Sequence, residues 1–78
     1  MDDKTKLLVL LGDICPDVDF AAEENLIDDG LIESLDLVTI VSEIMAQFDV
    51  EISVNDLLPE NFNSASAMLD LINAKRNG

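Results

Sequence analysis

The chain has 78 residues, of which 49% are hydrophobic, with three Phe and no Trp or Tyr. Its length allows one domain, and its aliphatic composition favours a small helical bundle over a β-sandwich or barrel. Seventeen acidic residues against four basic ones give a formal net charge of −13, which argues against nucleic acid and anionic lipid as partners and favours basic patches on other proteins. We therefore predict a single domain over residues 1–78, and we expect a monomer.

The cysteine content and the N-terminal residues indicate the cellular compartment of the protein. Cys15 is the only cysteine, which excludes an internal disulfide and a cysteine-cluster metal site. The apolar run 7–11 is too short to cross a bilayer, and Asp2 and Asp3 stand where a signal peptide needs positive charge. We expect a cytoplasmic protein without a membrane anchor.

The first predicted elements are a helix and a long loop. Leu7, Leu8 and Leu11 share one helical face, which predicts a helix from Asp3 to Leu11 that Gly12 ends. Residues 13–33 contain Pro16, Gly30 and many acids, and a loop of this length in a small domain is usually functional or disordered. Apolar residues along the loop favour order by pinning it to the bundle: Val18, Phe20, Leu26 and Ile27.

The strongest helical pattern runs from Ser34 to Phe48. At 100° per residue its apolar positions fall on one side of the helix. These positions are Leu37, Val38, Ile40, Val41, Ile44, Met45 and Phe48. Leu35 projects instead from the polar side, where it is either an ordinary exposed leucine or a contact for a partner.

The remaining chain predicts a connector and two further helical segments. Residues 50–54 alternate like a strand but have no strand to pair with, so we interpret them as an extended connector whose apolar residues face the bundle. A short helical turn follows over 55–58, which Pro59 stops. The last helix starts near Ser64 as N-cap, and Lys75 and Arg76 in its final turn suit the negative end of the helix dipole.

The residues offer little for catalysis. The chain has no histidine, Cys15 has no imidazole beside it, and Ser34 has no base in its local sequence, so we predict a protein that is not an enzyme. A calcium loop around Gly30 as its sixth residue would need a ligand at Ile27, which has none to give. We therefore predict no metal site.

The stretch Gly30-Leu-Ile-Glu-Ser-Leu-Asp36 places an acid-flanked serine at the start of an amphipathic helix. A serine there is most often a cap, yet the positive end of the helix dipole would also stabilise a phosphodiester on its hydroxyl. The stretch, with the Asp56-Leu-Leu-Pro59 turn and the helix from Ser64, resembles the acyl carrier protein family over nearly the whole chain. Glu33 departs from the usual Asp of that family.

The resemblance implies an all-α fold, a small four-helix bundle of three longer helices and one short helix. It also implies a 4′-phosphopantetheine esterified to Ser34, with Glu33, Leu35, Asp36 and Glu43 as residues that dock partner proteins. The implied partners are a phosphopantetheinyl transferase and acyl-activating or acyl-transferring enzymes with basic docking patches.

Three functions remain open from the sequence. The favoured one is carriage of acyl groups as thioesters for fatty-acid, polyketide or related synthesis. The length and the stretch 43–50 also resemble D-alanyl carrier proteins of teichoic acid modification. A bundle of this kind that is never modified is the third, and the intact Ser34 argues against it.

Overall fold

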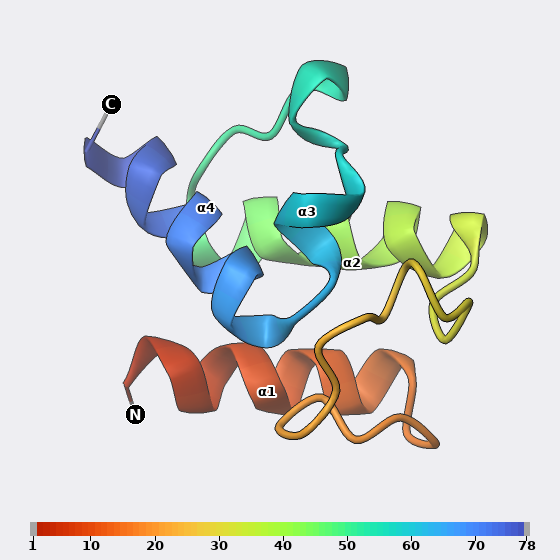
Figure 1. The fold of residues 1–78 in the computed structure, drawn as a ribbon. Helices are drawn as coiled ribbons and strands as arrows, with labels where there is room; N and C mark the ends of the chain where they lie inside the picture. The colour runs from red at the N-terminus through yellow and green to blue at the C-terminus, as the bar shows by residue number, and fades with distance from the viewer. Residues whose placement is uncertain (1, 78) are drawn as a thin grey trace.

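The computed structural model describes residues 2–77 as a bundle of four α-helices with no strand in that range (Figure 1). The helices are α1 (Asp3–Ile14), α2 (Ser34–Phe48), α3 (Pro59–Phe62) and α4 (Ala65–Asn77), and a 3-10 turn covers Val54–Asp56. Three helices are long and one is short, which confirms the predicted fold class. α1 and α2 run antiparallel, and α4 packs against α1 and α3.

Apolar side chains from all four helices and from the long loop meet in one core. The fully buried ones are Leu7, Leu11, Leu26, Ile40, Ile44, Phe62, Met68 and Ile72. Phe20 and Leu26 of the loop are buried, and Val18 and Ile27 pack partly against the core. The predicted anchoring of the loop is therefore confirmed.

Side chains cap the first turns of α1 and α4. The Asp2 carboxylate accepts a hydrogen bond from the Thr5 N–H at 2.7 Å at the start of α1. The Ser64 hydroxyl accepts one from the Ala67 N–H at 3.0 Å, which confirms Ser64 as the N-cap of α4. Each cap satisfies a backbone donor that the first turn of a helix leaves without a partner.

Two predicted helix ends are wrong. α1 continues through Gly12 to Ile14, and the Cys15 N–H closes its last turn on the Leu11 carbonyl at 2.9 Å. A glycine inside a helix costs only about 1 kcal/mol relative to alanine, which the burial of Cys15 beyond it can offset. Pro59 does not stop a helical turn but opens α3, because a proline at the first helical position gives up no hydrogen bond.

The apolar pattern is wrong at two positions. In the connector, Val50 and Ile52 are buried as predicted, but Val54 is 83% exposed. Ser53 turns the chain there, since its N–H and hydroxyl both bond to the Asp56 carboxylate. In α2, Val38 is 61% exposed although it lies at the edge of the predicted buried arc.

Candidate functional site

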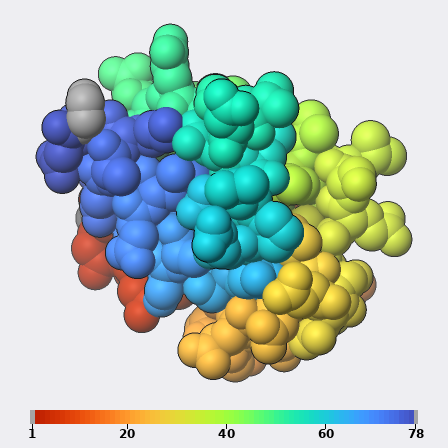
Figure 2. Space-filling view, turned by 45° about the horizontal axis from the view of Figure 1, so that its top comes forward, coloured from red at the N-terminus to blue at the C-terminus, as the bar shows by residue number. Residues whose placement is uncertain are grey.

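Ser34 is the first helical residue of α2, and its side chain is exposed. Glu33, not Ser34, is the N-cap, and its N–H donates to the Asp36 carboxylate at 3.4 Å. Within residues 2–77 the Ser34 hydroxyl takes part in no hydrogen bond, so capping does not occupy it. The residues that open α2 stand out at the edge of the molecule, yellow-green in Figure 2.

Besides its buried apolar side chains, the loop before Ser34 is held by hydrogen bonds to Asn63, a residue between α3 and α4. The Asn63 side-chain oxygen accepts from the N–H groups of Ile27 at 2.9 Å and Asp28 at 3.1 Å. Its amide donates to the Asp28 carboxylate at 3.1 Å, and its backbone carbonyl accepts from the Leu26 N–H at 2.9 Å. Gly30 then takes a left-handed conformation, with φ 71°, which only glycine adopts at little cost. Asn63 thus fixes the chain a few residues before the serine.

The surface around Ser34 combines apolar and acidic side chains. Leu35 is 81% exposed, which confirms its predicted position on the polar side of the helix, and Val38 follows Ser34 by one turn. Leu31, before the helix, is also exposed. Glu33 and Asp36 bring carboxylates to the same helix end. An exposed apolar centre with a charged rim is a common form of protein–protein interface.

Sequence reasoning missed Val38 and Leu31 in this surface. Val38 follows Ser34 by four residues, a spacing that places both on one helix face. Its place in an apolar stripe predicted burial instead. Glu43, which the resemblance grouped with these residues, lies nine residues beyond Ser34 and lines a groove between α1 and α2.

Cys15 lies close to the start of α2. Burial and the neighbouring Asp36 carboxylate raise the pKa of the Cys15 thiol, so this cysteine is protonated at neutral pH and a poor nucleophile.

Residues 2–77 contain neither a candidate metal site nor a candidate membrane-spanning helix. No group of three histidine, cysteine or carboxylate residues in that range is placed to hold a metal ion. No helix described there is long and apolar enough to cross a membrane.

A helix N-terminus suits a serine-linked phosphodiester, because its positive dipole end and free N–H groups stabilise the negative charge. Ser34 stands at the N-terminus of α2, and its exposed hydroxyl, which has no hydrogen bond among residues 2–77, is available for such a link. The fold and the site together define a small carrier protein.

Comparison with known families agrees with this class. The family model described as "Phosphopantetheine attachment site" matches residues 5–72. The chain therefore belongs to the phosphopantetheine-attachment family, whose members carry 4′-phosphopantetheine covalently on a serine.

Full-length relatives are similar to this chain. The D-alanyl carrier protein of Streptococcus mutans serotype c is 27% identical over 78 residues, covering 99% of each chain. The D-alanyl carrier proteins of Streptococcus thermophilus and Streptococcus gordonii are each 24% identical with the same coverage.

Proposed function

We propose that this protein carries an acyl group on a phosphopantetheine arm attached to Ser34 and is not itself an enzyme. The observation that carries the proposal is the exposed Ser34 hydroxyl at the first position of α2, which capping leaves free. When attached, the arm supplies a terminal thiol at which an acyl group is held as a thioester. The chain itself presents the serine, orients it through the loop that Asn63 holds, and offers a docking surface to partner enzymes.

The proposed docking residues beside the serine are Glu33, Leu35 and Asp36, to which the exposed Val38 adds apolar surface. An apolar side chain such as Leu35 contributes affinity when a partner buries it, whereas exposed carboxylates mainly set the encounter rate and the specificity. Basic patches on a phosphopantetheinyl transferase and on acyl-activating enzymes would meet these acids. Glu43 is a further proposed docking residue, but it lies nine residues after Ser34 on the opposite side of α2 and would therefore meet a different part of a partner.

The full-length relatives favour D-alanine as the cargo, since each is a D-alanyl carrier protein. Fatty-acid or polyketide carriage is the second candidate, which the Gly30–Asp36 stretch and the Leu57-Leu58-Pro59-Glu60 turn favour. Incubating the modified protein with ATP and either a D-alanine-activating ligase or a fatty-acyl-activating synthetase separates the two. The enzyme that adds its acyl group to the intact protein mass identifies the cargo.

The attachment site is tested by incubating the apo-protein with coenzyme A and a broad-specificity phosphopantetheinyl transferase, followed by mass measurement. The wild-type chain should gain one phosphopantetheinyl group, Ser34→Ala none, and Ser42→Ala, an exposed serine of the same helix, one as in the wild type. Modification mapped to Ser42, Ser53 or another serine would refute the site. No gain in the wild type would instead favour the unmodified interaction module.

A further inference from the structure

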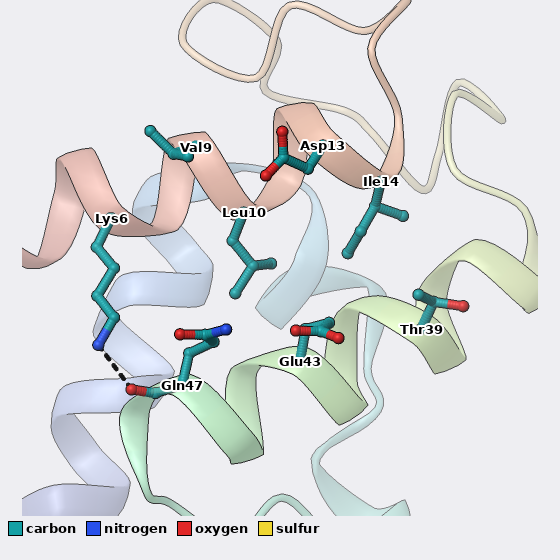
Figure 3. Close-up of a pocket in the computed structure, with 8 residues that line it drawn as sticks. All are labelled: Lys6, Val9, Leu10, Asp13, Ile14, Thr39, Glu43 and Gln47. Atoms are coloured by element: carbon teal, nitrogen blue, oxygen red, sulfur yellow. Dashed lines mark hydrogen bonds between the residues drawn. The ribbon is translucent and has the colours of Figure 1, made fainter.

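A groove of about 350 Å³ lies between α1 and α2, and its lining residues in the described part of the chain all come from these two helices (Figure 3). Leu10 and Ile14 of α1 point into the space between the helices and form an apolar floor. Val9, which is 51% exposed, stands on the α1 side. Figure 3 shows the bundle from behind relative to Figure 1, so α3 and α4 lie behind the groove.

The groove is bordered by two carboxylates from different helices. Asp13 of α1 and Glu43 of α2 are both exposed, and neither forms an ion pair within residues 2–77. Lys6, also a lining residue, donates to the Gln47 carbonyl at 2.7 Å and lies 4.9 Å from the centre of the Phe48 ring. Its charge is thus held at the far end of the groove, away from Asp13 and Glu43 (Figure 3).

We propose that this groove is a docking surface for a segment of a partner protein that carries a large apolar side chain between lysine or arginine residues. The apolar side chain would cover Leu10 and Ile14, and the flanking cations would meet Asp13 and Glu43. The net charge of −13 disfavours an anionic occupant. The volume, at the small end of ligand pockets, suits one or two inserted side chains.

The groove faces away from Ser34. Glu43 comes nine residues after Ser34, which is about 2.5 helical turns and places the two on opposite sides of α2. A partner bound in the groove would leave the serine and the neighbouring Val38 free for a second protein. A carrier could then stay attached to one protein while its arm serves another. The simultaneous binding of two proteins rests on the proposed carrier function, whereas the binding of a peptide in the groove does not depend on that function.

The test uses a fluorescently labelled amphipathic helical peptide of leucine and lysine, titrated into the Ser34→Ala protein at about 0.15 M salt, where exposed charges beyond a Debye length of about 8 Å are screened. Because this variant cannot be modified, peptide binding is read independently of the carrier function. We expect backbone amide NMR shifts to change at Val9, Ile14 and Thr39, which border the groove.

Charge reversal provides the decisive comparison. Asp13→Lys with Glu43→Lys should weaken peptide binding at least tenfold. Glu60→Lys with Asp70→Lys makes the same change of net charge on exposed residues of α3 and α4, and it should weaken binding less than threefold. Thermal unfolding checks that both variants are folded.

Equal weakening by the two charge reversals would show general attraction to an acidic protein and would overturn the proposal. Shift changes confined to residues around Ser34, or no binding of the peptide at millimolar concentration, would overturn it as well. Modification of the wild-type protein by the transferase is measured separately, so failure of the groove is distinguishable from failure of the carrier function.

Discussion

Asn63→Ala should loosen the loop that leads to Ser34. The substitution removes the acceptor of the Ile27 and Asp28 N–H groups and the donor to the Asp28 carboxylate. The Asn63 carbonyl remains to accept from the Leu26 N–H. Leu26 is fully buried, so the loop should stay attached at that residue while the segment after it becomes mobile.

The magnitude follows from three lost hydrogen bonds, each with a net value of about 0.5–1.5 kcal/mol. Two of them lie at exposed positions and count at the lower end, which gives about 1–3 kcal/mol for the free energy of unfolding. For a domain of this size about 1 kcal/mol shifts Tm by roughly 4–8 °C. We therefore expect Tm to fall by about 5–20 °C.

The assay combines thermal unfolding with amide hydrogen exchange. Asn73→Ala, an exposed asparagine of α4, is the matched control and should leave Tm nearly unchanged. In Asn63→Ala the Ile27 and Asp28 amides should exchange faster, and the transferase should modify Ser34 more slowly. If Tm and the exchange of these two amides equal those of the control, Asn63 does not hold the loop.

Three further outcomes are expected. Leu35→Ala with Val38→Ala should reduce the rate at which a partner enzyme loads its acyl group onto the protein about tenfold or more, since it removes exposed apolar surface. Circular dichroism should show an unchanged fold. An unaltered loading rate would place the docking surface elsewhere. Asp36→Asn with Glu43→Gln should lower the rate at which a partner enzyme loads its acyl group, and the difference in rate from the wild type should shrink as the salt concentration rises. A difference in rate that does not change with salt would contradict an electrostatic role. Hydrogen bonds from Arg76 and Lys75 lower the pKa of Asp3 and Asp56 respectively, and the Thr5 N–H lowers that of Asp2. Their stabilisation is present above the unfolded-state pKa of about 3.9 and is lost as pH falls through the lower folded-state values, so Tm should drop below about pH 4, and Arg76→Gln should reduce that drop.

The helices, and the position of Ser34 at the start of α2, could be predicted because their signals are local. The apolar stripe of α2, the Ser64 cap and the turn at Gly30 each depend on residues close in the sequence. The buried loop residues Phe20 and Leu26 could also be predicted, since large apolar side chains in a polar loop have few alternatives to burial.

The errors arose where distant contacts decide the outcome. Gly12 ends no helix, since α1 continues to Ile14 and brings Cys15 into the core, and Val38 is exposed although it belongs to the apolar stripe of α2. Asn63 gave no signal in the sequence, since its partners lie 35 and 36 residues away. The groove between α1 and α2 likewise depends on how two separate helices pack.

The few basic residues of this acidic chain form their contacts away from Ser34, so the acidic surface beside the serine is not neutralised. Arg76 pairs with Asp3 and Lys75 with Asp56, while Lys6 bonds to the Gln47 carbonyl. Lys6 and Arg76 also lie 4.9 and 5.4 Å from the centre of the Phe48 ring, within reach of a cation–π attraction.

These contacts gather near the C-terminal end of α2, whereas Ser34 opens the other end of that helix (Figure 1). Within residues 2–77 no basic side chain pairs with Glu33 or Asp36 beside the serine. Cations therefore stabilise one end of the bundle, and negative potential remains at the other end, where we propose that a basic partner docks. Since such a field raises association rates at low ionic strength, the proposed docking surface and the stabilising ion pairs would lie at opposite ends of the same helix.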